Sequence, residues 1–221
     1  MTPISIMING LPGNMAFVLA ETALADSRFK VLPYSLTGPE IQATDTAVGS
    51  ADLKLIPPDQ RESAIPRVIQ AQGPFICVDF THPSAVNRNA EFYCAQELPF
   101  VMGTTGGERG KLYEVVENSG CSAVIAPNMA KQIVGFQAMI QYAAQSFPGL
   151  FAGYGLAIKE SHQQGKADTS GTAKAMVDLF NQLGMDFNRE EIVQERDPLR
   201  QESIWAVPAP FLKGHAWHTY T

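Results

Sequence analysis

The sequence predicts an α/β protein in which a parallel sheet domain is followed by a smaller α+β domain. Short apolar runs of strand length alternate with helical patterns through residue 128, and this alternation is typical of a parallel sheet covered by helices on both faces. A glycine-rich turn follows the first apolar run. Beyond residue 128 the alternation stops and a longer apolar helix begins. We therefore expect one domain over residues 1–128 and a second over residues 129–221.

The first domain is expected to open with a strand over residues 4–9, because this apolar run suits a buried parallel strand. A helix is expected next, over residues 15–25. Further strands are expected at 28–34, 52–56, 75–80, 100–103 and 123–126, and further helices at 60–72, 84–97 and 108–118. This order predicts a parallel sheet with helices on both of its faces.

The second domain has a different rhythm. Helices are expected at 131–147 and 172–183, and strands at 155–160 and 214–221. The segment 190–202 is rich in charged residues, so we expect it to be a solvated connector.

Composition excludes several classes of protein. The chain has 221 residues, 45% of them apolar and 17% charged, as in globular proteins with a packed core. Its net charge is −6 and its basic residues are scattered, whereas nucleic acids and anionic membranes require clustered cations. Its three cysteines lack metal-ligand spacing, and its start does not read as a signal peptide. We expect neither nucleic acid nor membrane as a partner, and a location in the cytoplasm or a plastid-like interior.

The turn between the first strand and helix reads Gly10-x-x-Gly13-x-x-Ala16. Strand, turn and helix in this order are the context that a dinucleotide-binding fingerprint requires. Gly10 permits a tight turn, and Gly13 lets a pyrophosphate approach the free N–H groups at the helix start. The alternative is a turn that binds nothing. The turn predicts a Rossmann-type domain whose cofactor contacts include Gly10, Leu11, Pro12, Gly13, Asn14 and Met15.

The end of the second strand bears on the choice of cofactor. A site specific for NADH usually has Asp or Glu there to bind the ribose hydroxyls, whereas this chain offers Ser35 and Thr37. The hydroxyl and backbone groups of this segment could surround the 2′-phosphate of NADPH, or could allow either NADPH or NADH to bind. We expect NADPH, with NADH as the alternative.

Polar segments follow three later predicted strands, at the edge where open α/β sheets bind ligands. They are Asp79-Phe80-Thr81-His82-Pro83, Gly103-Thr104-Thr105-Gly106 and Ala126-Pro127-Asn128-Met129. A longer motif follows: Glu160-Ser161-His162-Gln163-Gln164-Gly165-Lys166-Ala167-Asp168-Thr169-Ser170-Gly171-Thr172-Ala173. With these motifs in this order, essentially the whole chain resembles dihydrodipicolinate reductase of lysine (diaminopimelate) biosynthesis, in its plant and cyanobacterial form.

The resemblance implies a role for each motif. The residues that would contact the cofactor beyond the first turn are Thr81, Gly103, Thr104, Thr105, Ala126, Pro127, Asn128 and Met129. His162 and Lys166 would be catalytic, and the substrate would be bound by Gln163, Ser170, Gly171 and Thr172.

The residue types fit this chemistry. The ordinary pKa of a histidine lies near neutral pH, so His162 can donate a proton, and Lys166 can pair with a substrate carboxylate. Ser170 is a natural N-cap, and the N–H groups of Gly171 and Thr172 could hold a carboxylate at that helix start. Asp168 either orients Lys166 or caps the turn. Taken singly, a loop histidine, a surface lysine and a plain helix cap are the alternatives.

Two other features have structural interpretations. His82, His215 and His218 lack an acidic or thiol partner at ligand spacing, so we expect strand packing and no metal site. Cys77 lies inside a predicted strand and is expected to be buried and unreactive.

The chain also departs from the family. Asn14 stands where the family usually has Arg or Lys, Ala16 replaces a third glycine, and Gln163 replaces a histidine of the bacterial motif. The chain stops at Thr221, where family members continue. We therefore expect a shortened substrate domain whose open sheet edge is covered by another copy, in a homodimer or homotetramer.

Three hypotheses about function follow. The first is an NAD(P)H-dependent reductase of 4-hydroxy-tetrahydrodipicolinate, in which a planar cyclic imine dicarboxylate accepts hydride and His162 donates a proton. The second is a diverged reductase of another planar acceptor, such as a quinone or aromatic carbonyl. The third is a non-catalytic dinucleotide-binding relative. The retained motifs favour the first.

Overall fold

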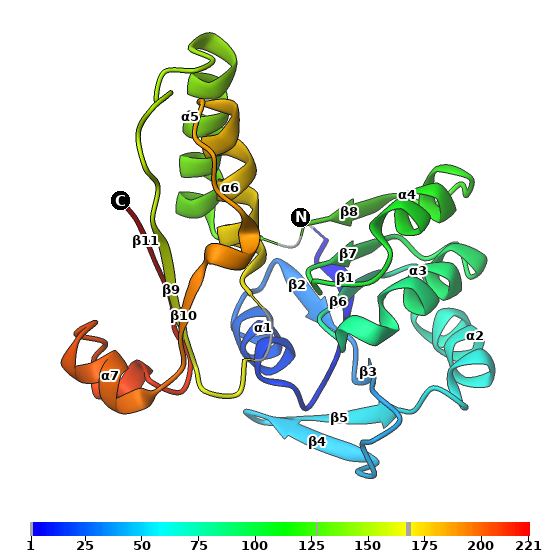
Figure 1. Cartoon of the computed structure of the whole chain (residues 1–221). Coiled ribbons are helices and arrows are strands. Elements are labelled where there is room, and N and C mark those ends of the chain that lie inside the picture. Colours follow the sequence, from blue (N-terminus) through cyan, green and yellow to red (C-terminus); the bar gives the residue numbers. More distant parts are fainter. Residues whose placement is uncertain (1, 127, 167–168) are drawn as a thin grey trace. The chain divides into compact units, whose positions relative to one another are not determined.

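The computed structural model describes residues 2–126, 128–166 and 169–221. The chain divides into two compact units, Met1–Pro127 and Asn128–Thr221, and each has its own sheet and helices (Figure 1). The predicted α/β class is confirmed, since the first unit contains a parallel sheet flanked by helices.

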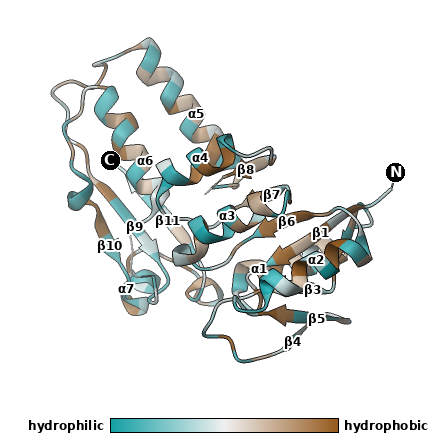
Figure 2. Cartoon of the chain, turned by 90° about the vertical axis from the view of Figure 1, so that its right-hand side faces the viewer, coloured by the Kyte–Doolittle hydropathy of each residue, from teal (hydrophilic) through white to brown (hydrophobic). Residues whose placement is uncertain are grey.

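The main sheet of the first unit has five parallel strands in the order β2-β1-β6-β7-β8. These strands are β1 (Ile4–Asn9), β2 (Phe29–Val31), β6 (Ile76–Asp79), β7 (Phe100–Met102) and β8 (Ala123–Ile125). The strands are largely apolar, as the brown segments of β1 and β6 in Figure 2 show. A parallel sheet with both faces covered requires this composition, because neither face meets water.

Two apolar clusters form the core of the first unit. The side chains of β1 alternate between them: Ile6 and Ile8 join one cluster, and Met7 joins the other. Four helices surround the sheet, namely α1 (Asn14–Leu24), α2 (Arg61–Gln72), α3 (Val86–Ala95) and α4 (Arg109–Glu117). Helix α1 contributes Ala16 and Ala20 to the first cluster, and small side chains let its backbone approach the strands closely.

A separate three-stranded sheet, in the order β3-β5-β4, corrects two predictions. The sequence predicted one strand over 28–34 and assigned 52–56 to the alternating parallel pattern. Strand β2 instead ends at Val31, and after Pro33, which has no N–H to donate, β3 (Tyr34–Leu36) pairs with β5 (Ala51–Ile56). Strand β4 (Asp45–Val48) was not predicted. It forms an antiparallel hairpin with β5, and the turn between them contains Gly49 at φ +59°.

The second unit has a three-stranded sheet in the order β10-β9-β11. Strand β9 (Ile158–His162) lies in the middle, parallel to β10 (Val193–Glu195) and antiparallel to β11 (Ala216–Tyr220). Helices α5 (Lys131–Ser146), α6 (Gly171–Gln182) and α7 (Pro198–Ser203) complete the unit. Its core gathers Ile158 from β9 with Ala173 and Val177 from α6. No described helix is both long and apolar enough to cross a membrane.

Most residues of the segment 190–202 are exposed, as predicted, but the prediction that it is a connector is wrong, because β10 and most of α7 lie within it. Two of its polar side chains have partners inside the unit. The buried Gln201 side chain donates hydrogen bonds to the carbonyl oxygens of His162 at 2.6 Å and Glu195 at 3.1 Å. Arg196 reaches a buried carboxylate of β9, that of Glu160. The charged composition therefore indicated the exposure of most of the segment but not the inward contacts of Arg196 and Gln201.

Candidate functional site

The turn after β1 can be formed only by glycine at its key positions. Gly10 has φ +111°, and a Cβ there would lie 2.4 Å from the Phe80 carbonyl oxygen. A Cβ on Gly13 would lie 2.7 Å from the Gly10 oxygen. Gly13 is also the N-cap of α1 and supplies no side-chain cap. The first N–H groups of α1 are therefore available to an anion.

Ser35 and Thr37 hold this turn from the neighbouring strand. The Leu11 N–H donates to Ser35 Oγ at 3.2 Å, and Thr37 Oγ1 donates to the Leu11 carbonyl oxygen at 2.8 Å. Both Ser35 and Thr37 are buried. Their hydroxyls thus contact the phosphate turn itself, a role that the sequence did not indicate.

Asp79, the last residue of β6, organises the carboxyl edge of the sheet and was not predicted as a site residue. Its Oδ1 accepts hydrogen bonds from the N–H and hydroxyl of Thr81, at 3.0 and 2.7 Å, and from Thr104 Oγ1 at 3.2 Å. Its Oδ2 accepts from Tyr93 at 2.7 Å and Asn89 at 3.0 Å. Burial raises the pKa of Tyr93 well above its ordinary value, so this phenol remains a donor. Asp79 therefore brings together two predicted cofactor residues, Thr81 and Thr104.

The other predicted cofactor residues differ in exposure. Gly103 is buried and packs on the Phe80 ring, where a Cβ would lie 2.2 Å from a ring carbon. Thr105 and Met129 are exposed, and Ala126 is partly buried. Pro127 lies outside the described residues.

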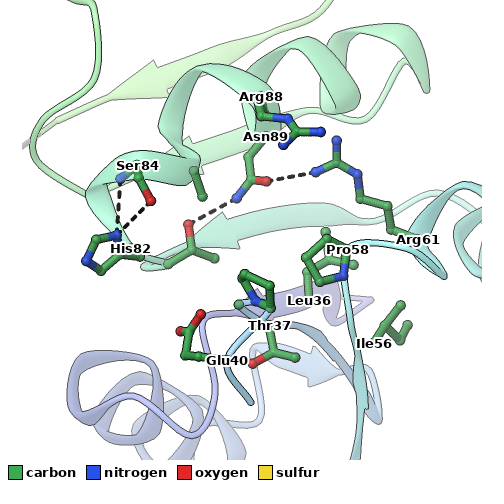
Figure 3. A pocket seen from close by; sticks show the side chains of 14 residues that line it. Leu36, Thr37, Glu40, Ile56, Pro58, Arg61, His82, Ser84, Arg88 and Asn89 are labelled. Carbon is green, nitrogen blue, oxygen red and sulfur yellow. Dashed lines mark hydrogen bonds between the residues drawn. The ribbon is translucent and has the colours of Figure 1, made fainter. Parts of the chain in front are cut away.

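A pocket of about 510 Å³ opens beside the ends of β3 and β6 (Figure 3). It is lined by the segment after β3 and by the start of α3, and it includes Thr37 and Thr81. It also contains Arg61 and Arg88, which the sequence did not identify because they lie on helices remote from the glycine-rich turn.

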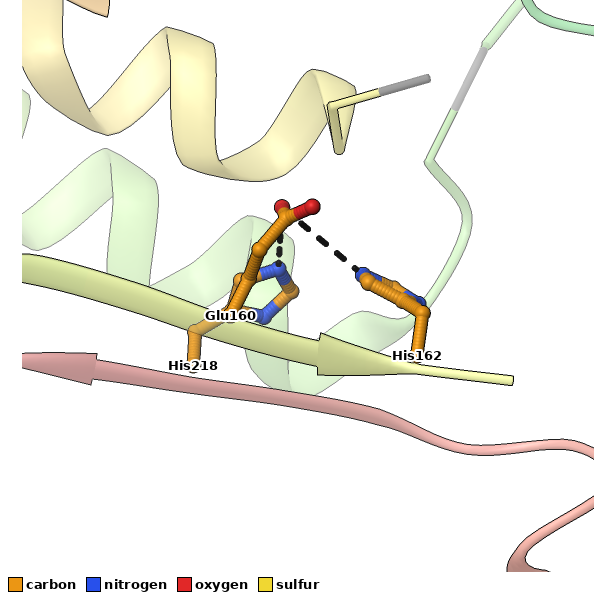
Figure 4. A group of neighbouring side chains, drawn as sticks. All are labelled: Glu160, His162 and His218. Carbon is orange, nitrogen blue, oxygen red and sulfur yellow. Dashed lines mark ion pairs between the residues drawn. The ribbon is translucent and has the colours of Figure 1, made fainter. Parts of the chain in front are cut away.

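In the second unit, the buried carboxylate of Glu160 lies at the centre of a polar cluster (Figure 4). One oxygen, Oε1, pairs with the Arg196 guanidinium. The other, Oε2, accepts a hydrogen bond from the Ser170 N–H at 2.9 Å and lies 3.9 Å from His162 Nε2 and 3.8 Å from His218 Nε2. Glu160 is in the predicted motif, but its role was not predicted.

His162 is the last residue of β9, and its side chain is only 10% exposed. Its Nε2 is buried and has no hydrogen-bond partner among the described residues. The pKa of His162 is lowered to about 4, chiefly by burial; Glu160 opposes this shift, whereas His218 and the positive groups of Lys166 and Arg196 add to it. The imidazole is therefore neutral at neutral pH in this state.

His218 lies directly opposite Glu160 in the β9–β11 pairing, and its ring packs edge-to-face on His162 with centroids 5.2 Å apart. Burial lowers its pKa as well. The expectation that His218 has no acidic partner is thus wrong. His215, in contrast, lies near Ser161, with Nε2 2.8 Å from its Oγ.

A metal ion is a chemical alternative for this cluster. Ligand atoms of Glu160, His162 and His218 all lie within 4.8 Å of one another. However, the Arg196 guanidinium already pairs with the carboxylate and would repel a second cation. We therefore assign no metal here.

Of the predicted substrate residues, Ser170, Gly171 and Thr172 lie at the start of α6, next to this cluster, whereas Gln163 directly follows β9. Ser170 occupies the N-cap position, but its side chain makes no capping hydrogen bond, which corrects the prediction that it caps the helix. Its N–H instead donates to Glu160. Thr172 Oγ1 accepts a hydrogen bond from Asn128 Nδ2 at 3.2 Å.

The segment before α6 is tied to the cluster through the main chain. The Lys166 N–H donates to the Gln163 carbonyl oxygen at 3.0 Å, and the Lys166 carbonyl oxygen accepts a hydrogen bond from Arg196 Nε at 3.0 Å. Asp168 lies outside the described residues, so neither role proposed for it is tested.

Comparisons with known proteins identify the family of the chain. The family model "Dihydrodipicolinate reductase, N-terminus" matches residues 4–129. The chain is 42% identical over 215 residues to the rice "Probable 4-hydroxy-tetrahydrodipicolinate reductase 2, chloroplastic", covering 97% of this chain and 66% of the relative. It is also 42% identical over 217 residues to "4-hydroxy-tetrahydrodipicolinate reductase 1, chloroplastic" of Arabidopsis thaliana, covering 98% and 62%. The chain thus spans somewhat less than two thirds of these plant relatives.

A more distant relative and a solved structure point to the same family and fold. The reductase of Thermosynechococcus vestitus is 30% identical over 206 residues, with 90% of this chain and 71% of that protein covered. The solved structure "Dipicolinate bound Dihydrodipicolinate reductase from Paenisporosarcina sp. TG-14" superposes with a TM-score of 0.58 at 21% identity, over 88% of this chain and 78% of that chain, and so supports the fold. The family model covers more than half of the sequence, and the chain belongs to the dihydrodipicolinate reductase family.

Proposed function

We propose that this protein is an NAD(P)H-dependent reductase of 4-hydroxy-tetrahydrodipicolinate, the activity for which its plant relatives are named. The observation that carries the proposal is the buried His162 imidazole, whose Nε2 lacks a hydrogen-bond partner among the described residues. The start of α6 and Lys166 belong to the same motif. A proton donor such as His162, next to a lysine and a helix N-terminus that can bind anions, suits a substrate with two carboxylates.

The first unit would bind the cofactor. Its glycine turn leaves the N–H groups at the start of α1 free for a pyrophosphate, and Asp79 fixes Thr81 and Thr104 at the same edge of the sheet. A bound reduced nicotinamide supplies the hydride. NADPH is the proposed cofactor, because Ser35 and Thr37 replace the acidic residue that binds the ribose of NADH.

The second unit would bind the substrate and supply the proton. Lys166 and the N–H groups of Gly171 and Thr172 would hold its carboxylates. His162, neutral before binding, would take up a proton when the dianionic substrate enters, because a nearby anion favours the imidazolium. It would then donate this proton next to the carbon that receives the hydride. Donation returns the imidazole to its neutral form, and it takes up its next proton from water when another substrate binds. Glu160 would position the imidazole.

A coupled assay tests the proposal. The upstream synthase supplies 4-hydroxy-tetrahydrodipicolinate to the full-length protein, and oxidation of NADPH is followed by absorbance. We expect oxidation that depends on the synthase product. The absence of oxidation, with NADPH bound and the substrate saturating, would contradict the proposal.

We further propose that the protein acts as a homo-oligomer in the cytoplasm or a plastid-like compartment. Large apolar side chains are exposed on α5 and after it, including Met139, Tyr142 and Phe147, and such exposed groups are typical of association surfaces. The plant relatives are named as chloroplastic. Light scattering of the purified protein tests self-association, and a monomer at high concentration would contradict it.

A further inference from the structure

The pocket in Figure 3 combines apolar walls with two arginines. Leu36, Ile56 and Pro58 line one part of it, and Arg61 and Arg88 extend from the α2 and α3 side. Its volume of about 510 Å³ falls within the range of small-molecule sites. The pocket lies at the end of β3, and strand ends of this kind are where dinucleotide-binding sheets hold the adenosine ribose.

Arg61 is held in place before any ligand binds. Its side chain is 14% exposed, its Nη1 donates to Asn89 Oδ1 at 3.0 Å, and its guanidinium lies over the Phe92 ring at 4.6 Å. Asn89 is itself buried, and its Nδ2 donates to Asp79 Oδ2 and Thr81 Oγ1, both at 3.0 Å. Because the amide nitrogen is engaged there, the amide oxygen must face Arg61. Asp79 thus orients Arg61 through Asn89.

The positive charge of the two arginines is only weakly neutralised. The Glu62 carboxylate lies 3.7 Å from Arg61 Nε but is 67% exposed, and such a surface pair contributes little. Arg88 is exposed and has no hydrogen-bond or ion-pair partner within the described ranges. Glu40, an acidic residue that does line the pocket, lies against Gly38. An anion would therefore favour the arginine side.

We infer that Arg61 and Arg88 bind a phosphate monoester on the adenosine ribose, the 2′-phosphate of NADPH, and so make the protein prefer NADPH to NADH. The inference rests on the proposed use of a pyridine nucleotide. Guanidinium groups suit the geometry and charge of phosphate oxygens. The preference would then come from α2 and α3, since Ser35 and Thr37 use their hydroxyls to hold the glycine turn.

Binding titrations of the full chain test this inference without requiring turnover. NADPH, NADH, adenosine 2′,5′-bisphosphate and 5′-AMP are titrated by calorimetry into the unmodified protein and into Arg61→Gln and Arg88→Gln. Arg67→Gln is the matched control, because Arg67 is an exposed arginine of α2 outside the pocket. Loss of a charged hydrogen bond should weaken the two 2′-phosphate ligands about tenfold or more and leave NADH and 5′-AMP within about twofold.

The titrations separate the role of the two arginines from cofactor use itself. Arg61→Lys, which keeps the charge, should recover part of the affinity for NADPH, and Arg88→Gln carries little risk to folding because Arg88 is exposed. Equal weakening of NADPH and NADH in both glutamine variants would overturn the inference while leaving cofactor use intact. If the unmodified protein bound neither nucleotide, the proposed function would itself be contradicted.

Discussion

The buried imidazole of His162 should make the protein sensitive to acid. Its pKa is lowered from 6.5 to about 4 in the folded state, chiefly by burial. The unfolded chain therefore binds the proton first as the pH falls, so the stability from His162 is present above pH 6.5 and is lost toward pH 4. At about 1.4 kcal/mol per pH unit, the difference between 6.5 and about 4 corresponds to roughly 3 kcal/mol, most of it lost by about pH 4.5.

The assay is urea unfolding of the unmodified protein and of His162→Gln at pH 7 and at about pH 4.5. Other groups titrate in both proteins, so their effects cancel in the comparison. The variant should lose roughly 2 to 3 kcal/mol less stability across this interval than the unmodified protein. His215→Gln is the control, since His215 contacts the Ser161 hydroxyl rather than Glu160. Equal losses in the unmodified protein and His162→Gln would refute the assignment of a buried neutral imidazole.

Three further predictions concern both units. Pyridine-2,6-dicarboxylate, a dianion, should bind to the unmodified protein at pH 7 with uptake of a proton, and to His162→Gln without it. Calorimetry in buffers of different ionisation enthalpy measures the number of protons taken up. Equal proton uptake in the two proteins would contradict the proton-donor role. Asp79→Asn should destabilise the first unit by roughly 1–3 kcal/mol and weaken nucleotide binding, because donors from Thr81, Asn89 and Tyr93 would lose their carboxylate acceptor. Thermal melts with and without NADPH report both effects. Unchanged melting temperatures would count against the hydrogen-bond network around Asp79. Gly10→Ala should abolish nucleotide binding in a calorimetric titration, since the added Cβ would lie 2.4 Å from the Phe80 carbonyl oxygen. Retained affinity for the nucleotide would exclude this turn as the phosphate site.

The sequence predicted those parts of the fold that local patterns determine. The strand, glycine turn and helix from Ile4 to Leu24 appear with nearly the expected bounds, because the apolar periodicity and the turn lie within one short segment. The small sheet of β3, β4 and β5 was missed, since nothing in a run such as Asp52 to Ile56 indicates which strand it will pair with. Strand pairing is decided by tertiary contacts.

The same reason explains the missed site residues. His162, Lys166 and Ser170 lie in one continuous motif and could be identified together. Arg196 and His218 join Glu160 only because β10 and β11 flank β9. Arg61 likewise reaches Asn89 from a different helix. Isolated arginines and histidines carry no sequence signal for such contacts, and the charge of 190–202 did not indicate that β10 and most of α7 form there.

The central claim, that His162 donates the proton in a nicotinamide-dependent reduction, is tested most directly by kcat for NADPH oxidation with saturating 4-hydroxy-tetrahydrodipicolinate. His162→Gln should lower kcat by about 10²- to 10⁴-fold, the usual contribution of a general acid, while His215→Gln stays within about twofold. A His162→Gln variant that turned over at the rate of the unmodified protein would contradict the account.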